Sequence, residues 1–358
     1  MLAMQDQNSS TSSVSAQRSN ASTSTPTPSP EGSWMVVLSM TLGMASNIVA
    51  LAILAKAYAR LRRRSKAVFL LFASFLVTTD FLGHALPGAL VLILHSAPVL
   101  PSHPAFCQFL GGSLVFFGLC PLLLGCVMAA ERCLGVARPL LHAALVTTPR
   151  ARLALGLVWL LALGVALLPS LGLGAYATQH PGTWCFIRVL DPEDASDLGF
   201  VLLFSGLALG SLAMALACNT VSGVVLLRAR LRRKACPRSA AKSHDIEMVV
   251  QLVGIMVASC ICWSPLLIFG LMSVTSSYGR VLDDEQKGYY HRLLLTGVRL
   301  ATWNQILDPW VYILLRRAVL RKIYCIIGRH GNALRRSTLR RSTLQRWDIS
   351  SFHNSEKK

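Results

Sequence analysis

Ionisable and amide side chains interrupt an apolar stretch late in the chain, residues 293–315. Arg299, Asn304 and Asp308 lie there within the segment RLATWNQILDPWVY. An ionisable group inside a membrane-length helix is costly unless it is paired or binds a ligand, so these positions are candidates for a functional site. A guanidinium offers a planar fork of N–H donors that matches a carboxylate, and Arg299 is therefore predicted to bind an anion. The simpler alternative is that Arg299 extends to the membrane surface without a ligand.

Helical geometry separates Arg299 from the polar residues that follow it. Asn304, Asp308 and Tyr312 recur at i+4 spacing and are predicted to form a polar stripe that relays a conformational change. Arg299 precedes Asp308 by about 13 Å along a helix, and the two side chains fall on opposite faces. Both can face the same interior only if the helix is kinked or rewound, which Pro309 permits.

The composition of the whole chain predicts a membrane protein. Of its 358 residues, 53% are hydrophobic and 14% are charged, which is too apolar for a soluble globular protein. Several apolar stretches exceed the roughly 20 residues that a helix needs to cross a bilayer. The predicted fold is an all-α membrane protein, a seven-transmembrane helix bundle over residues 34–315. Its seven spans are predicted at residues 34–58, 67–94, 105–133, 152–174, 198–228, 245–273 and 293–315.

Charge in the connections between the spans predicts their orientation. Lys and Arg cluster between spans one and two, between spans five and six, and after residue 315, and the connection between spans three and four is also basic. Because basic connections stay in the cytoplasm, we expect a multi-pass plasma-membrane protein with its N-terminus outside the cell and its C-terminus in the cytoplasm. A net charge of +19 could indicate nucleic-acid binding, but its distribution in short clusters favours the membrane interpretation.

The N-terminal segment is polar. Residues 1–33 are rich in Ser, Thr and Pro and lack the apolar core of a signal peptide, so they are predicted to form a disordered extracellular tail. Asn8 and Asn20 lie in glycosylation sequons, which is consistent with that location.

The C-terminal segment has two predicted parts. Residues 316–330 alternate basic and apolar side chains and predict an amphipathic helix on the inner membrane surface, where Cys325 is either palmitoylated or unmodified. Residues 331–358 are predicted to form a basic cytoplasmic tail. It contains a tandem LRRST repeat, which is either phosphorylated by basophilic kinases or simply attracted to anionic lipid. The candidate phosphorylation sites are Ser337, Thr338, Ser342 and Thr343.

Two of the ten cysteines are predicted to form a disulfide. Cys107 begins span three on its outer side and Cys185 lies in the second outer loop, so both sit in the oxidising compartment. A bond between them would hold this loop over the bundle. Neither a CxxC pair with metal-site spacing nor a histidine cluster occurs in the sequence, so no metal site and no cofactor are predicted.

Polar residues near the middle of the spans indicate a second site. Asn47, Asp80, Asn304 and Asp308 fall near mid-span. They either hold the helices together by hydrogen bonds or form a hydrated cluster that couples the two halves of the bundle.

Adjacent opposite charges stand at the inner end of span three. Arg132 is predicted to pair with Glu131 beside it or with Asp245, which opens span six at the same depth. Breaking the pair would release the inner end of span six, unless the charges only extend to the membrane surface. Pro265 and Pro309 are predicted to kink spans six and seven, so that either helix can swing.

At these residues the chain resembles the prostanoid receptors, a branch of the rhodopsin-like G-protein-coupled receptors. The resemblance covers residues 40–325. Glu131-Arg132-Cys133 stands where most such receptors have Asp-Arg-Tyr, and the segments PGTWC (181–185) and RLATWNQILDPW (299–310) are specific to the prostanoid branch. The more general landmarks of the receptors are Asn47, Asp80, Cys107, Trp159, Cys185, CWSP at 262–265 and DPWVY at 308–312.

The resemblance implies a ligand and the residues that hold it. It is greatest to receptors that bind prostaglandin E2 and act through a Gq-type G protein and phospholipase C to mobilise calcium, with the prostaglandin F receptor as the alternative. Arg299 and Thr183 are implied to hold the ligand carboxylate, beside Trp184, and Met272 is expected to contact its hydrocarbon chains. His95 stands where these receptors usually carry a tyrosine, so either binding depends on pH or Arg299 and Thr183 suffice. Binding is expected to shift the region around Trp263 and Pro265 and to open the cytoplasmic side around Arg132.

Other functional classes fit the sequence less well. A seven-span transporter of a lipid anion is the alternative, but it predicts inverted repeats and a continuous polar path, neither of which the sequence shows. A retinal-linked pump needs a lysine in the last span, and residues 293–315 contain none. An enzyme is not predicted, because His84 with Asp80 is too small a constellation for catalysis.

Overall fold

The computed structural model describes the seven predicted spans and most of their connections. Residues 1–29 of the predicted extracellular tail, the amphipathic helix and the basic tail lie outside the described residues, together with their candidate glycosylation, palmitoylation and phosphorylation sites. Residues 30–33, which were predicted to belong to the disordered tail, instead form the start of the first helix. The side chains of His95, Asp245 and Tyr312 also lie outside the description. The described residues are 30–61, 67–96, 104–180, 182–190, 194–232, 242–277 and 283–314.

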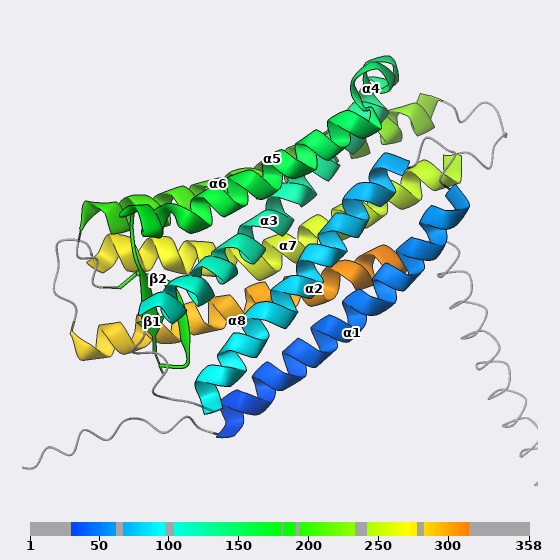
Figure 1. Cartoon of the computed structure of the whole chain (residues 1–358). Helices are drawn as coiled ribbons and strands as arrows, with labels where there is room; N and C mark the ends of the chain where they lie inside the picture. Colours follow the sequence, from blue (N-terminus) through cyan, green and yellow to red (C-terminus); the bar gives the residue numbers. More distant parts are fainter. Residues whose placement is uncertain are drawn as a thin grey trace, which may run out of the picture.

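Seven long helices lie side by side in one bundle (Figure 1). Each overlaps one predicted span, and the prediction of a seven-helix bundle is confirmed. The helices are α1 (Pro30–Leu61), α2 (Ala67–Ser96), α3 (Pro104–Ala137), α5 (Thr148–Leu167), α6 (Ala195–Arg232), α7 (Lys242–Ser277) and α8 (Asp284–Leu314).

Four short elements, which the sequence did not predict, lie at the two ends of the bundle. A helix, α4 (Pro139–Leu145), follows α3 at one end, which we call the α4 end. At the other end a 3-10 turn, η2 (Leu168–Leu171), leads into a hairpin of β1 (Tyr176–Gln179) and β2 (Trp184–Ile187). We call this the hairpin end.

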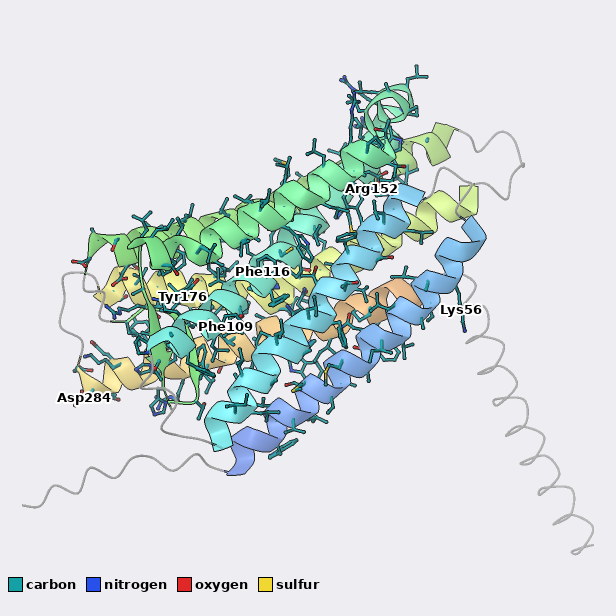
Figure 2. The ribbon with its side chains drawn as sticks, in the orientation of Figure 1. Lys56, Phe109, Phe116, Arg152, Tyr176 and Asp284 are labelled. Carbon is teal, nitrogen blue, oxygen red and sulfur yellow. A yellow bond between two sulfur atoms is a disulfide. The ribbon has the colours of Figure 1, made fainter. Side chains whose placement is uncertain are left out.

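The outward faces of the helices are suited to a hydrocarbon environment. Leu153, Leu157 and Leu160 on α5 are all more than half exposed, which is unfavourable in water but not in lipid. Six of the described helices are long and apolar enough to cross a membrane, whereas α8 is long enough but less apolar. Figure 2 shows Lys56 and Arg152 toward the α4 end and Asp284 at the hairpin end.

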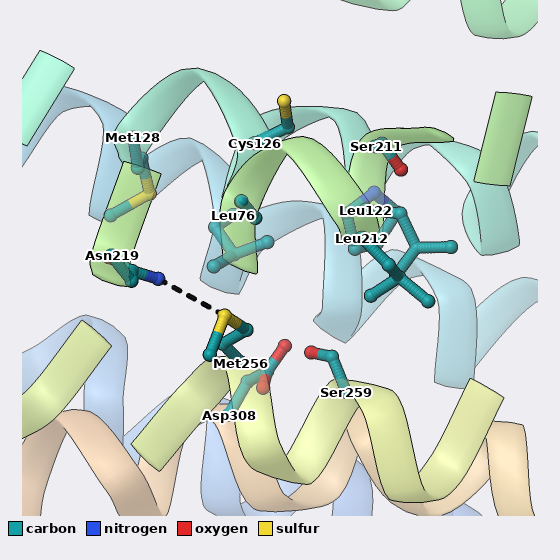
Figure 3. Close-up of a pocket in the computed structure, with 13 residues that line it drawn as sticks. Leu76, Leu122, Cys126, Met128, Ser211, Leu212, Asn219, Met256, Ser259 and Asp308 are labelled. Carbon is teal, nitrogen blue, oxygen red and sulfur yellow. Dashed lines mark hydrogen bonds between the residues drawn. The ribbon is translucent and has the colours of Figure 1, made fainter. Parts of the chain in front are cut away.

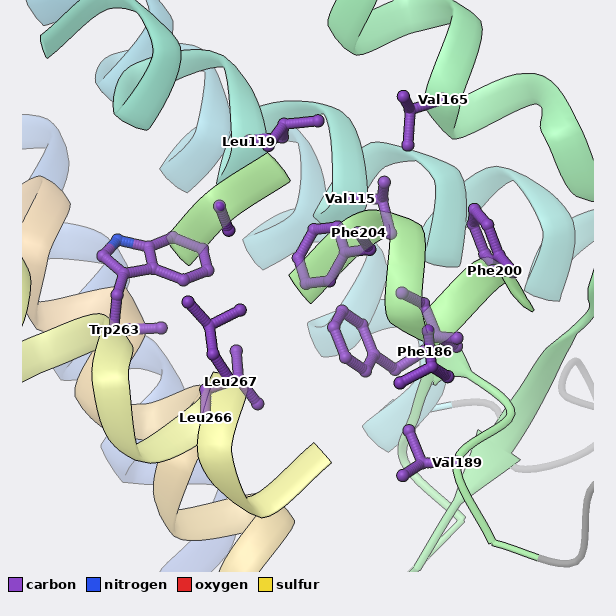
Figure 4. Close-up of a cluster of buried hydrophobic side chains, with 14 of the residues drawn as sticks. Val115, Leu119, Val165, Phe186, Val189, Phe200, Phe204, Trp263, Leu266 and Leu267 are labelled. Carbon is purple, nitrogen blue, oxygen red and sulfur yellow. The ribbon is translucent and has the colours of Figure 1, made fainter. Parts of the chain in front are cut away.

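The core near the hairpin end includes residues of the hairpin itself. Phe186 and Val189 pack with Phe204 of α6 and Leu267 of α7 in one buried cluster (Figure 4). The hairpin therefore fills space between the helices and is more than a surface cover. The Tyr176 hydroxyl donates to the Ala166 carbonyl at 2.8 Å, and burial raises the pKa of this phenol.

A disulfide fixes the hairpin to α3. Cys107 and Cys185 are bonded, with their Cα atoms 5.4 Å apart, so the predicted pairing is confirmed. The two strands are antiparallel, and Thr178 of β1 lies opposite Cys185 of β2. In Figure 1 the hairpin crosses the bundle from the side of α5 and α6 toward α8.

Two prolines free backbone carbonyls that neighbouring helices then satisfy. Proline lacks an N–H, so the carbonyl four residues before it loses its helical donor. Pro121 in α3 leaves the Phe117 carbonyl free, and the Gln305 side chain donates to it at 2.8 Å from α8. Pro309 leaves the carbonyl of Gln305 free in turn, and Asn47 of α1 donates to it at 3.1 Å. These two bonds join α1, α8 and α3 within the bundle.

The Gln305 bond to Phe117 can be tested by removing and restoring its donor. Gln305→Leu leaves the buried Phe117 carbonyl without a partner and should lower the free energy of unfolding by about 1–3 kcal/mol. Pro121→Ala supplies a helical N–H to the same carbonyl, so the double variant should regain most of the loss. Thermal unfolding of the purified protein measures both effects. A double variant no more stable than Gln305→Leu would contradict the assignment.

Candidate functional site

Arg299 lies on the exposed face of α8. Trp303 and Trp310 follow on the same face toward the α4 end, and both are more than a third exposed. Asp308 is buried on the opposite face. The helix continues through Pro309 without turning Arg299 and Asp308 to the same side, so the two residues belong to separate sites.

The Arg299 guanidinium has no protein partner in the described part of the chain. No ion pair or hydrogen bond reaches it from those residues. A cation on an apolar, tryptophan-bearing face of a membrane helix is poorly solvated. Its planar donors are thus available to an external anion, and a carboxylate is the group that fits them in bidentate fashion.

The hairpin supplies the second part of the predicted ligand site. Thr183 and Trp184 are both buried, and the Trp184 indole N–H donates to the His180 carbonyl at 3.1 Å. Met272 lies on the exposed face of α7 with Ile261 and Ile268, so in this conformation it points out of the bundle. The expectation that Met272 contacts the ligand therefore finds no support in its position.

A buried polar layer lies on the inward side of α8. Asn304 donates to the Asp308 carboxylate at 3.1 Å. Asp80 of α2 is fully buried, and neither of its carboxylate oxygens has a hydrogen-bond partner among the described residues. One oxygen of Asp308 and the Nε2 atom of His84 are unsatisfied in the same way. Buried polar groups need partners, so this layer has the composition of a hydrated site. The Asn47 bond to the Gln305 carbonyl shows that hydrogen bonds between helices are present as well, and hydration stays a prediction.

A small cavity adjoins this layer (Figure 3). It measures about 30 Å³, and Asp308, Asn219, Met256 and Ser259 line it together with residues of α2 and α3. Asn219 of α6 donates to the Met256 sulfur at 3.5 Å, while its side-chain oxygen is unsatisfied. The cavity has room for about two water molecules but is roughly a tenth of the volume that a lipid-sized ligand needs. It is a place for water and cannot hold such a ligand.

Trp263 of α7 packs against α3, one helical turn from the cavity toward the hairpin end. Its ring is buried and lies directly on Gly118, where a Cβ atom would come within 2.7 Å of the indole. Pro265 follows inside the same helix. The predicted switch region therefore lies at a close contact between two helices, in the core of the bundle.

A charged cluster joins α3 to α4. Glu131 pairs with Arg132, which is one of the two pairings predicted, and the Arg132 guanidinium also lies 4.6 Å from the centre of the Phe69 ring. The second oxygen of Glu131 lies 2.8 Å from Nε2 of His142. Glu131 is buried, so both of its partners help to compensate its charge. Sequence reasoning missed His142, because it depends on the helical turn after Pro139.

The His142 contact is one of few attachments of α4. This helix has no buried residue. Arg150 donates to the carbonyls of Ala144 and Leu145 at 3.0 and 3.3 Å, which holds its C-terminal end. Polar contacts with Glu131 and Arg150 therefore position α4 in place of apolar packing.

Removing the His142 imidazole should loosen α4. His142→Ala deletes a hydrogen bond to a carboxylate, and such a bond contributes about 1–2 kcal/mol at a partly exposed position. Amide hydrogen exchange in residues 139–145 should therefore become roughly five- to thirtyfold faster. Leu140→Ala is the matched control, because Leu140 is 88% exposed in the same helix. Equal exchange in both variants would show that His142 does not hold the helix.

Comparisons with known proteins agree with this arrangement. Residues 46–312 match the 7 transmembrane receptor (rhodopsin family). A crystal structure of squid rhodopsin superposes with a TM-score of 0.66 over 82% of this chain and 84% of that chain, at 16% identity, which shows the shared fold.

Several relatives are similar over most of their length. The prostaglandin E2 receptor EP1 subtype of Canis lupus familiaris is 47% identical over 362 residues, and that of Homo sapiens is 46% identical over 364. Both alignments cover 89% of this chain and 88% of the relative. The prostaglandin F2-alpha receptor of Homo sapiens is 42% identical over 325 residues, 90% of this chain and 86% of the relative. These relatives are receptors, so neither an enzyme nor a transporter is supported. The chain therefore belongs to the prostanoid receptors, within the rhodopsin family of seven-transmembrane receptors.

Proposed function

We propose that this receptor binds prostaglandin E2 and signals through a Gq-type G protein and phospholipase C to mobilise calcium. The observation that carries the proposal is the unpaired Arg299 guanidinium on α8, which suits an acidic lipid. The choice of prostaglandin E2 follows the relatives named for that ligand, which are 46–47% identical to this chain.

The proposed orientation places the hairpin end outside the cell. Basic residues such as Lys56 and Arg152 mark the α4 end, which is typical of the cytoplasmic side (Figure 2). The Cys107–Cys185 disulfide supports an oxidising environment at the hairpin end. In a plasma-membrane receptor of this orientation, the N-terminal tail with its sequons is extracellular, and the basic C-terminal segment is cytoplasmic.

In the proposed complex, Arg299 pairs with the ligand carboxylate. Thr183 and His95 are assigned as further hydrogen-bond donors and Trp184 as an apolar wall. Thr183 belongs to the hairpin turn, which the disulfide holds across the mouth of the bundle. Met272 lies on the exposed face of its helix, as Arg299 does, and it is retained as an apolar contact for the hydrocarbon chains on its chemistry alone.

The proposed activation step runs from the hairpin end to the α4 end. Ligand binding favours a conformation in which Trp263 leaves its contact with Gly118 and α7 swings about Pro265. The hydrated layer around Asp80 and Asp308 accommodates the movement of polar groups. Rearrangement around Glu131 and Arg132 then opens the α4 end to the G protein.

A second candidate function rests on sequence similarity. The prostaglandin F2-alpha receptor of Homo sapiens is 42% identical to this chain, only slightly less than the E2 receptors. An F-type prostaglandin carries the same carboxylate chemistry toward Arg299. Ligand discrimination must therefore come from groups other than the carboxylate anchor.

Arg299→Ala should abolish high-affinity binding of tritiated prostaglandin E2. Truncating one partner of a desolvated charge pair costs about 2–5 kcal/mol, which is a loss of roughly thirty- to several-thousand-fold in affinity. Saturation binding on membranes measures the loss, and antibody labelling of intact cells measures surface expression, which should be preserved.

Arg292→Ala provides the matched control for this variant. Arg292 is an exposed arginine of the same helix and lies seven residues, about two turns, nearer the hairpin end on nearly the same face. Its replacement should change affinity little. Unchanged prostaglandin E2 affinity in Arg299→Ala would refute the carboxylate role.

A ligand panel should separate the two candidate functions. We expect prostaglandin E2 to compete best, ahead of prostaglandins F2-alpha and D2 and a thromboxane mimic. We also expect calcium to rise without a change in cyclic AMP. Competition binding with both second messengers recorded in parallel is the measurement. A best response to F2-alpha would replace the first candidate with the second, and the absence of a calcium rise would refute Gq coupling.

A further inference from the structure

The Arg132 guanidinium lies against the first turn of α2. Its central carbon is 4.6 Å from the centre of the Phe69 ring, which is within the distance at which an aromatic face attracts a cation. Phe69 belongs to the first turn of α2, and Arg132 lies near the end of α3. The contact therefore joins two helices at the α4 end of the bundle.

Little of the Arg132 side chain is open to solvent. Its exposed fraction is 16%. The Nε and Nη2 groups donate to the two oxygens of the Glu131 carboxylate, which is held in turn by His142 of α4. The Phe69 ring uses none of these donors, so the aromatic contact and the ion pair are compatible. A protein that approaches the α4 end finds little of the guanidinium in this conformation.

The partial burial of Arg132 determines how much the aromatic contact contributes. A cation over an aromatic ring favours the paired state by about two- to thirtyfold, and the higher value applies where the cation is desolvated. The low exposure of Arg132 places the contact toward that end of the range. Phe69 also packs against the buried cluster that contains Phe72 and Leu76. Its attraction for the cation and its apolar packing therefore need separate tests.

We propose that Phe69 is a positioning residue for signalling, whose ring stabilises the closed conformation in which Arg132 is withheld from the G protein. Arg132 leaves the ring when the α4 end opens. Loss of the aromatic face should therefore raise signalling in the absence of a ligand. This consequence rests on the activation step of the proposed function, whereas the stabilisation of the closed conformation by the contact does not.

Substitutions of Phe69 distinguish attraction for the cation from packing. Phe69→Leu retains an apolar side chain but removes the aromatic face. Phe69→Tyr and Phe69→Trp retain an aromatic face, and tryptophan attracts cations most strongly. Packing alone predicts a different order, because the large tryptophan side chain disturbs a close-packed interior.

Basal nucleotide exchange tests the role in signalling. Binding of radiolabelled GTPγS is measured without ligand on membranes that contain the full-length receptor, with purified Gq, Gi and Gs in turn. Phe69→Leu should raise basal exchange about two- to thirtyfold per receptor, and Phe69→Tyr and Phe69→Trp should leave it near the native value. Phe75→Leu is the matched control, because Phe75 belongs to the same helix but packs against Trp159.

The outcomes of this experiment separate the role of Phe69 from the choice of G protein. Unchanged exchange in Phe69→Leu, or an equal rise in Phe69→Trp, would overturn the proposal. A rise in Phe69→Leu that occurs only with Gi or Gs would refute the Gq assignment while supporting the role of Phe69.

A double-mutant cycle measures the contact without ligand or G protein. Arg132→Gln removes the cation and keeps a hydrogen-bond donor for Glu131. Thermal unfolding of the purified receptor in detergent gives the effect of Phe69→Leu with and without this change. The shift of the unfolding equilibrium caused by Phe69→Leu should be about two- to thirtyfold smaller when Arg132→Gln is present. Equal shifts in both backgrounds would overturn the proposal, because the ring would then act by packing alone.

Discussion

The backbone carbonyls of Phe117 and Gln305 accept the hydrogen bonds that link three helices at the centre of the bundle. Each belongs to a helix that a proline has deprived of one hydrogen bond, and each is satisfied by an amide side chain from another helix. Hydrocarbon offers no alternative partner, so three helices must stay in register for these groups to be satisfied. The rest of the polar interior is arranged around this link, with Asp80 and Asp308 nearby. The interior is thus tied together on one side by these bonds, while on the other side it holds buried polar atoms without a partner among the described residues.

Much of the fold could be predicted because a segment that crosses the membrane must be a long apolar helix and basic connections mark its cytoplasmic end. Long apolar spans, basic connections and two cysteines on one side were enough for the helices and for the Cys107–Cys185 bond. The hairpin and α4 could not be predicted, because strands of four residues and a helix of seven are set by tertiary contacts and not by local pattern.

In the candidate site, too, some residues could be predicted from the sequence and others depend on tertiary contacts. The depth of Arg299 in the bundle followed from the sequence. The direction in which its side chain points did not, because the packing of neighbouring helices decides which face of a helix is buried. Helical geometry had already indicated that Arg299 and Asp308 point apart, and they do. His142 lies eleven residues beyond Glu131, across a chain reversal that no periodicity reveals.

Because the hairpin forms part of the core, the order in which the chain is made limits when the receptor can be completed. Residues 176–189 are synthesised before α6 and α7, yet Phe186 and Val189 acquire their apolar neighbours only after those helices are present. The disulfide with Cys107 needs nothing beyond residue 185 and can therefore retain the hairpin while the remaining helices are inserted. Insertions or bulky modifications in this loop would be expected to interfere with assembly itself, unlike changes in an ordinary surface loop.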